Sequence, residues 1–262
     1  MHVLGLQLDI VWENKAANLD KVRRLLSDAR PETGTLVVLP EMFATGFTTA
    51  SVEDTGESVA EIAKQYGVRI LAGLKRRIGG PRSVVAAPPD GRDGARPSNF
   101  QNVAVLFDAQ GREIARYAKM HPFKFAGENV EPGAEPVVVD CGEFKLAPAV
   151  CYDLRFPELF RAGVKHGANL FAVIANWPTS RLDHWLTLLK ARAIENQSYV
   201  IGVNRCGRDP NVEYPGHSQI LSPRGEVLAD AGENEGAVRA ELNLPELQDY
   251  RMKFPALATV IS

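Results

Sequence analysis

Two patterns of apolar and polar positions recur along this chain of 262 residues. Short, continuous apolar runs at residues 35–40, 146–150 and 170–174 are typical of strands buried in a sheet. Longer segments at residues 14–30 and 182–197 have apolar side chains three and four positions apart, which is typical of a helix with one buried face. Strand-like and helix-like segments follow one another along the chain, which indicates an α/β fold.

The order of these segments is repeated. Both halves of the chain run strand, helix, strand, helix, strand and hairpin, and the hairpins turn at residues 108–111 and 222–225. We interpret this as a weak internal duplication, which predicts two similar α/β units whose sheets pack face to face with helices outside. We expect one domain over residues 1–262, with a tail over about 245–262 made of a short helix and an extended end. The other expected elements are strands at residues 3–10, 68–74, 102–107, 113–117, 199–203, 217–221 and 226–229, and helices at residues 58–66 and about 157–165.

The charge balance and the cysteines restrict the class of protein. Lys and Arg number 30 against 32 Asp and Glu, so we expect neither nucleic acid nor an anionic membrane as a partner, but a small and roughly neutral molecule. Cys141, Cys151 and Cys206 lack CxxC spacing and neighbouring His ligands, which argues against a disulfide framework and a zinc site. The N-terminus does not have the features of a signal peptide, and no apolar run approaches the roughly 20 residues that cross a bilayer. These observations predict a cytoplasmic protein that needs no metal or cofactor.

Residues 75–98 differ in composition from the rest of the chain. They are rich in Gly, Pro and Arg, which predicts a long surface loop. The five arginines of this segment would suit a binding patch, but the nearly neutral overall charge favours a solvated loop.

The segment KLAPAVCYDLRFPELFR, residues 145–161, changes from a strand pattern to a helix pattern within six residues of Cys151. Pro157 and Glu158 suit the first turn of a helix, because a missing N–H and a negative charge are both tolerated there. We therefore expect Cys151 on a tight bend at the carboxyl edge of a sheet, next to backbone N–H groups that could bind an oxyanion. The alternative is a small apolar residue that fills the end of a strand.

Two further charged residues stand at the ends of predicted strands. Glu41 follows the buried run at residues 35–40, where a carboxylate is costly unless it is solvated or paired, and its alternative role is a helix cap or a surface acid. Lys119 follows the second strand of the first hairpin, and plain surface charge is its alternative role. Because neighbouring strands of an α/β sheet end at one edge, Glu41, Lys119 and Cys151 could share a pocket.

These three residue types suit the hydrolysis of an amide. A free thiol with a pKa near ~8.5 is only slightly ionised at neutral pH, so an attacking cysteine needs a base or a nearby cation. Glu41 could be the base and Lys119 the cation. The Lys119 ammonium and the backbone N–H of Tyr152 could then hold the oxyanion, while Glu41 passes a proton to the departing ammonia and takes one from the hydrolytic water. No metal is required.

Four stretches together resemble the carbon–nitrogen hydrolase (nitrilase) superfamily over essentially the whole chain: LPEMFATGF around Glu41, YAKMHPF around Lys119, VCYDLRFPEL around Cys151, and NWP followed by HWLTLLKARAIENQSYVIGVNR. The resemblance implies a four-layer αββα sandwich, a Glu–Lys–Cys triad, and homodimers in which the sandwiches stack. It makes Glu41 the general base, Lys119 the oxyanion lysine and Cys151 the nucleophile. Glu128 falls where members carry a second glutamate that helps to position the lysine or the substrate.

Within the superfamily, CYDLRFPEL and the NWP…HW…ARAIENQ stretch are most similar to the bacterial omega-amidases. Those enzymes release ammonia from the terminal amide of 2-oxo acids such as 2-oxoglutaramate, through a cysteine thioester. Alternatives with the same triad are a deaminated glutathione amidase, an N-carbamoyl amino acid amidohydrolase and a nitrilase. A non-catalytic binding module is a further alternative, against which the complete triad and the bend both argue.

A substrate of this class carries a carboxylate, which needs a cationic or N–H partner. Arg155 is our candidate, and its alternative role is a structural arginine paired with a glutamate. The segment at residues 75–98 is longer and more basic than the usual connection in the superfamily, which bears on the rim of the pocket. The aromatic residues that could line a small pocket, unless they belong to the ordinary core, are Phe43, Phe47, Tyr152 and Trp177.

Overall fold

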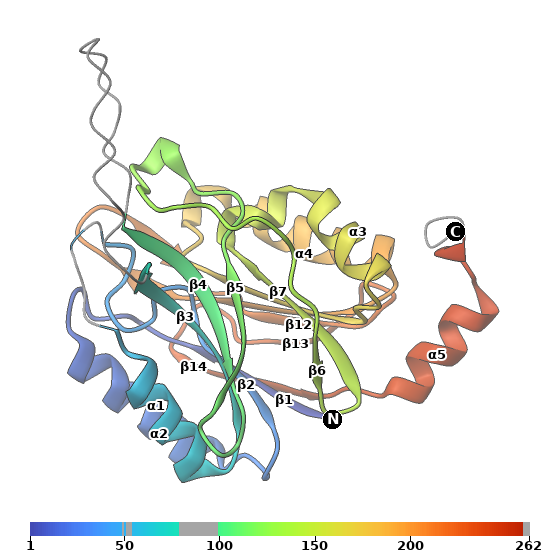
Figure 1. Cartoon of the computed structure of the whole chain (residues 1–262), viewed down its shortest axis with the longest axis horizontal. Helices are drawn as coiled ribbons and strands as arrows, with labels where there is room; N and C mark the ends of the chain where they lie inside the picture. The colour runs from blue at the N-terminus through green and yellow to red at the C-terminus, as the bar shows by residue number, and fades with distance from the viewer. Residues whose placement is uncertain (49, 51–53, 79–98, 259–262) are drawn as a thin grey trace.

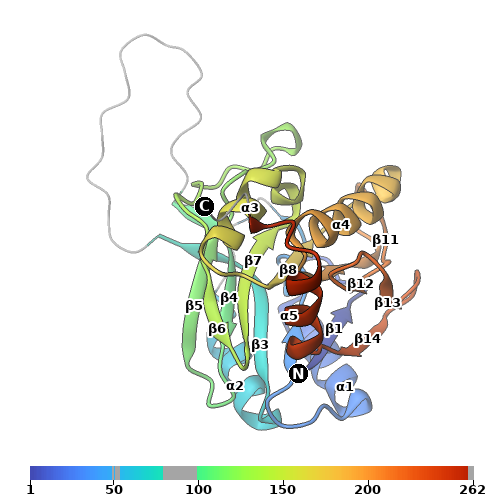
Figure 2. The same ribbon diagram turned by 90° about the vertical axis from the view of Figure 1, so that its right-hand side faces the viewer.

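The computed structural model describes residues 1–48, 50, 54–78 and 99–258. Two six-stranded sheets pack face to face, and helices cover the outer face of each sheet (Figure 1). The view turned by a quarter (Figure 2) shows the same layers from the side. The expected αββα sandwich is confirmed.

The strands form two large sheets and one small one. The first sheet contains β1 (His2–Gln7), β2 (Leu36–Val38), β3 (Arg69–Arg77), β4 (Phe100–Phe107), β5 (Glu113–Ala118) and β14 (Gly236–Glu241). The second contains β6 (Val139–Cys141), β7 (Phe144–Val150), β8 (Leu170–Ala175), β9 (Tyr199–Asn204), β12 (Gln219–Leu221) and β13 (Val227–Asp230). A separate two-stranded sheet consists of β10 (Cys206–Arg208) and β11 (Glu213–Pro215).

Helices lie outside these sheets. The α-helices are α1 (Lys15–Ala29), α2 (Gly56–Tyr66), α3 (Pro157–Lys165), α4 (Leu182–Asn196) and α5 (Leu244–Lys253). Three short 3₁₀ turns are η1 (Lys124–Ala126), η2 (Cys151–Arg155) and η3 (Thr179–Arg181). Helices α1 and α2 cover the first sheet, and α3 and α4 cover the second (Figure 1).

The predicted duplication is visible in the strand orders, which are β14-β1-β2-β3-β4-β5 and β13-β12-β9-β8-β7-β6. Strands β1, β2 and β3 are parallel, and β4 and β5 follow antiparallel; β7, β8 and β9 are parallel, and β12 and β13 follow antiparallel. Each half also has one added antiparallel edge strand, β14 beside β1 and β6 beside β7. Because β14 comes from near the C-terminus, the end of the chain completes the first sheet.

The continuous apolar run of β2 reflects burial on both faces. Leu36 and Val38 belong to the core cluster that contains residues of both sheets, whereas Val37 belongs to the cluster formed with α1 and α2. Successive side chains of a strand point to opposite faces, and both faces of β2 are covered. Each position of the strand is therefore apolar, and the strand directs the residues that follow it to the edge of the sheet.

The prediction of a surface loop over residues 75–98 was wrong for its first three residues. Residues 75–77 continue β3, paired with residues 100–102 of β4, and the side chain of Lys75 is buried, with 8% of the residue exposed. Residues 79–98 lie outside the described part of the chain. The sequence analysis also missed β6, β10, β11 and β14.

The C-terminal helix expected near residue 245 is present as α5, which lies outside the two-sheet core at one end of the sandwich (Figure 1; Figure 2). Within the described residues, no helix is both long enough and apolar enough to cross a membrane. The assignment of residues 1–262 to a single domain stays a prediction.

Candidate active site

A pocket of about 450 Å³ opens where the ends of several strands from both sheets meet. Cys151 and Lys119 both line it, as the sequence predicted. The wall is completed by the residues after β8, by η3 and by β11. Its lining residues are Phe47, Lys119, Phe123, Ala126, Cys151, Tyr152, Arg155, Asn176, Trp177, Pro178, Ser180, Arg181, Val212 and Tyr214.

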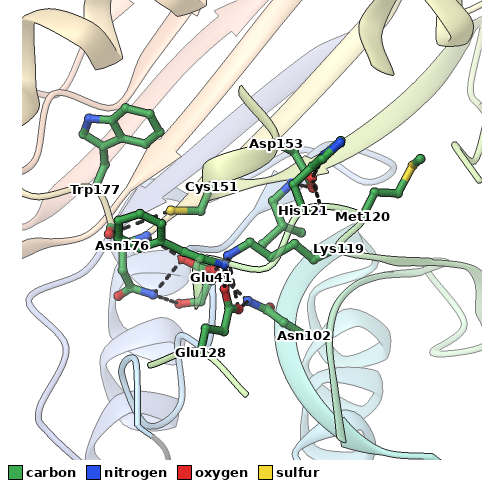
Figure 3. A network of polar contacts seen from close by, with 12 residues as sticks. Glu41, Asn102, Lys119, Met120, His121, Glu128, Cys151, Asp153, Asn176 and Trp177 are labelled. Carbon is green, nitrogen blue, oxygen red and sulfur yellow. Dashed lines mark hydrogen bonds and ion pairs between the residues drawn. The ribbon is translucent and has the colours of Figure 1, made fainter. Parts of the chain in front are cut away.

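Cys151 lies on the predicted bend between strand and helix. β7 ends at Val150, Cys151 begins η2 with a left-handed φ of 49°, and α3 begins at Pro157. A positive φ is unusual for a residue with a side chain, so neighbouring contacts must hold it. The Cys151 thiol points toward the carbonyl oxygen of Asn176, at 3.9 Å from Sγ (Figure 3). The backbone N–H of Tyr152 lies in the first turn of η2, where N–H groups have no acceptor within the turn.

Asp153 supplies contacts that hold this bend. Its buried carboxylate accepts from the backbone N–H of Val150 at 3.0 Å and from the Tyr117 hydroxyl at 2.8 Å. Its other oxygen accepts from the backbone N–H of His121 at 2.9 Å and lies 2.8 Å from Nδ1 of the same residue. Tyr117 and His121 flank Lys119 in sequence, so one carboxylate ties the segment of the lysine to the bend of the cysteine (Figure 3).

Glu41 and Lys119 form a fully buried ion pair. The distance from Lys119 Nζ to Glu41 Oε1 is 3.0 Å, and neither side chain is exposed to solvent. Glu41 also accepts from Asn102 Nδ2 at 2.6 Å and from the backbone N–H of Asn176 at 2.9 Å (Figure 3). The side-chain Nδ2 of Asn176 donates to Glu41 Oε2, the oxygen that accepts from the backbone of Asn176, at 3.2 Å. It also donates to the backbone carbonyl of Glu41 at 2.8 Å. Glu41 is therefore neither a helix cap nor a surface acid.

Gly73 allows the backbone of Glu41 to cross beside β3. A Cβ atom at Gly73 would lie 2.5 Å from Glu41 Cα and 2.5 Å from the carbonyl oxygen of Pro40. The carbonyl oxygen of Gly73 accepts from the backbone N–H of Phe43 at 3.3 Å. Since any larger residue would displace this crossing, the glycine fixes where the carboxylate stands.

Glu128 lies on the other side of Lys119. Its oxygens accept from Lys119 Nζ at 2.8 and 3.1 Å, from Asn102 Nδ2 at 2.7 Å and from the backbone N–H of Phe123 at 2.5 Å. Asn102 thus donates one hydrogen to each of two carboxylates, and the ammonium lies between them (Figure 3). This arrangement fits a residue that positions the lysine.

The charges of the ion pair reinforce each other. Burial on its own would raise the pKa of Glu41, but the Lys119 ammonium and the hydrogen bonds from Asn102 and Asn176 hold that pKa below its usual value. Burial would likewise lower the pKa of Lys119, but the Glu41 and Glu128 carboxylates carry it above the usual range. Glu41 is therefore ionised and Lys119 protonated at neutral pH.

The thiol of Cys151 is neutral in this environment. Burial, followed by the nearby Glu41 carboxylate, raises the pKa of Cys151 well above its usual value, although Lys119 acts in the opposite direction. A neutral thiol beside an ionised carboxylate can react only if its proton leaves during the attack. Within the described residues, no group of three His, Cys, Asp or Glu side chains could hold a metal ion.

Four of the five candidate substrate contacts line the pocket: Phe47, Tyr152, Arg155 and Trp177. Phe43 does not, and its assignment to the pocket was wrong. Its side chain is 0% exposed and packs into the core cluster of α1 and α2, because Met42 takes a left-handed φ of 44° and turns the chain after Glu41.

Arg155 has no carboxylate partner among the described residues. Its guanidinium lies over the ring of Trp177, at 4.9 Å from the ring centroid, and one of its nitrogens is 3.1 Å from His184 Nδ1. The alternative role of an arginine paired with a glutamate is therefore absent from the described structure.

The sequence analysis missed several residues of the site. Asn102 begins the strand expected at residues 102–107, and Asn176 lies two residues after the strand expected at residues 170–174. Each is a polar amide beside a buried apolar run, a signal similar to the one that identified Glu41. Arg181 and Tyr214 were missed because they lie on η3 and β11, which are three residues long and show no periodicity.

The sequence of this chain is similar to those of known proteins over most of its length. The family model described as Carbon-nitrogen hydrolase matches residues 5–252. A 2-oxoglutaramate amidase of Bacillus subtilis is 34% identical over 260 residues, covering 95% of this chain and 93% of that protein. An omega-amidase of Yersinia enterocolitica, YafV, is 40% identical over 257 residues, covering 96% of this chain and 93% of that protein.

A solved structure is similar to this chain in its fold. The protein XC1258 of Xanthomonas campestris, described as a CN-hydrolase superfamily protein with an arsenic adduct in the active site, superposes with a TM-score of 0.85. It is 28% identical in sequence, and the match covers 99% of this chain and 96% of that one.

The contacts of Asp153 generate a prediction about stability. In Asp153→Asn, an NH₂ group replaces one of the two carboxylate oxygens. Both oxygens accept hydrogen bonds, so in either orientation of the new side chain at least one donor loses its acceptor. We expect the free energy of unfolding to fall by about 1–3 kcal/mol, measured by urea denaturation. The control is Asp20→Asn, which changes an exposed carboxylate paired with Arg23 and should stay within about 0.5 kcal/mol of the parent protein. Equal stabilities for the two variants would refute the structural role of Asp153.

Proposed function

The chain belongs to the carbon–nitrogen hydrolase family, and we propose that it releases ammonia from the terminal amide of a small 2-oxo dicarboxylic acid monoamide, of the 2-oxoglutaramate or 2-oxosuccinamate type. The observation that carries the chemistry is the buried Glu41–Lys119 ion pair at the pocket that Lys119 and Cys151 both line. The substrate class is supported by relatives named for this activity and by a pocket that, among the described residues, is lined by cationic but not by acidic side chains.

Cys151 is the nucleophile in this proposal. Its sulfur adds to the amide carbonyl carbon while Glu41 accepts the thiol proton, and negative charge moves to the carbonyl oxygen. The Lys119 ammonium and the backbone N–H of Tyr152 stabilise that oxygen. One such donor is typically worth ~2.7–4 kcal/mol of the barrier. Glu128 holds the ammonium in place and takes no proton.

Ammonia leaves in the next step. Glu41 gives its proton to the amide nitrogen, the C–N bond breaks, and the acyl group remains on Cys151 as a thioester. A water molecule then loses a proton to Glu41 and attacks the thioester carbonyl. The C–S bond breaks, Glu41 returns the proton to sulfur, and the dicarboxylate product leaves. One carboxylate thus carries a proton in both halves of the reaction.

We also propose that the protein is a cytoplasmic homodimer. Cys141, Cys151 and Cys206 are all unpaired, which suits a reducing compartment and can be checked by cell fractionation. Met252 of α5 and Phe254, which directly follows that helix, are 75% and 58% exposed, and exposed apolar side chains of this size suit a contact with a second copy. Sedimentation equilibrium should give twice the mass of 28.6 kDa at micromolar concentration. A monomer there would contradict the proposed dimer.

The proposed reaction is tested by comparing substrates. We expect kcat/KM, measured by ammonia release, to be higher for 2-oxoglutaramate than for deaminated glutathione, an N-carbamoyl amino acid or a simple nitrile, by on the order of tenfold or more. Cys151→Ala should abolish turnover and keep the melting temperature. Cys141→Ala, which removes a buried cysteine outside the pocket, should retain turnover. Preference for another substrate would overturn the substrate class, and turnover by Cys151→Ala would exclude the thioester mechanism.

The pH dependence follows from the shifted groups. The pKa of Glu41 is lowered, so its base form and its contribution to stability are both present above its unfolded value of 4.5 and are lost only as the pH falls through the lower folded value. The pKa of Lys119 is raised, so the ammonium persists on the alkaline side. We expect kcat/KM to be nearly flat from about pH 5 to pH 9, with folding followed by fluorescence in parallel. An acid inflection between about pH 6 and pH 7 would contradict an ionised Glu41.

A further inference from the structure

Three cationic side chains line the pocket, and no acidic side chain does so among the described residues. Lys119 is held by two carboxylates, Glu41 and Glu128, and it serves the reacting carbonyl oxygen, so it is not the partner of a carboxylate at the other end of the substrate. The pocket therefore has two guanidinium groups, those of Arg155 and Arg181, whose charge is not balanced by any acid of the described chain. Their surroundings differ.

Arg155 is partly engaged by the protein. Its guanidinium lies over Trp177, and one of its nitrogens is 3.1 Å from His184 Nδ1. Both contacts fix its position, and the second occupies part of the planar fork through which an arginine binds a carboxylate with two parallel hydrogen bonds.

Arg181 has a fixed backbone and a free head group. Its N–H donates to the carbonyl oxygen of Pro178 at 3.0 Å, and its own carbonyl accepts from Trp177 Nε1 at 2.8 Å. The guanidinium lies over the ring of Phe123, at 5.5 Å from the centroid, and no acceptor of the described chain bonds to it. Both aromatic residues line the same pocket. Near such apolar walls a charge pair is stronger than it would be in open water.

We propose that Arg181 is the specificity-determining residue that binds the carboxylate of the substrate, and that Arg155 is secondary to it. This inference rests on the proposed function, because a 2-oxo monoamide carries its carboxylate at the end away from the scissile amide. The free fork of Arg181 can take both oxygens of that carboxylate in parallel hydrogen bonds. The reacting carbonyl stays with Cys151 and Lys119.

This placement separates binding from chemistry. An interaction made equally in the ground state and the transition state changes KM and leaves kcat nearly unchanged. A residue with a merely structural role would instead lower turnover for every substrate. The useful comparison is between 2-oxoglutaramate and 4-oxopentanamide, which keeps the amide and the ketone but has a methyl group in place of the carboxylate.

Arg181→Gln tests the proposal. We expect KM for 2-oxoglutaramate to rise about 10- to 100-fold, with kcat within about threefold and kcat/KM for 4-oxopentanamide within about twofold. Arg181→Lys, which keeps the charge and loses the fork, should recover part of the loss. Arg208→Gln is the matched control, because this exposed arginine pairs with Glu213 outside the pocket, and it should leave both substrates unchanged.

The outcomes separate this inference from the proposed function. If the parent protein does not prefer 2-oxoglutaramate to 4-oxopentanamide, the proposed function fails and the inference fails with it. If the parent protein has that preference and Arg181→Gln keeps it, only the inference is overturned. An equal loss for both substrates would also overturn it, as would a selective loss in Arg155→Gln without one in Arg181→Gln. If Arg181→Gln does not fold, Arg181→Lys decides by the same comparison.

Discussion

The structure of this site depends on keeping a charged carboxylate and a charged ammonium together away from water. Removing such ions from solvent costs several kcal/mol each, and their attraction offsets that cost only when further hydrogen bonds satisfy the remaining atoms. Glu41 and Lys119 meet this requirement with Asn102, Asn176 and Glu128. Each of these partners comes from a different strand end or loop, so the ion pair requires that both sheets be in place.

The duplicated architecture explains how such distant residues meet. Glu41 follows β2 of the first sheet, and Cys151 and Asn176 follow β7 and β8 of the second. Face-to-face packing brings the two carboxyl edges together, as in other α/β sheets, where ligands bind at the ends of strands. The strained φ of Cys151 is tolerated there because Asp153 joins the bend to the lysine segment.

The sequence predicted those site residues that directly follow a continuous run of apolar side chains. Glu41 and Cys151 were recognisable because each directly follows a continuous apolar run, and the order of the runs predicted the layers. It could not predict the pairing of Asn102 with Glu41, which lie 61 residues apart and meet only through the packing of the sheet. Phe43 was misplaced because a left-handed residue at Met42 reverses the side to which the chain points. Arg181 lies on a turn too short to show any periodicity.

The distribution of charge explains how the site can serve an anionic substrate. The buried cluster has two carboxylates for one ammonium, so on its own it does not attract a carboxylate. Arg155 and Arg181 line the same pocket but make no bond to that cluster. They can neutralise a substrate carboxylate without moving the proton that Glu41 and Cys151 exchange. Binding of the carboxylate and transfer of the proton therefore use separate residues. Substitution of the arginines can change which substrate is bound while the hydrolytic chemistry stays the same.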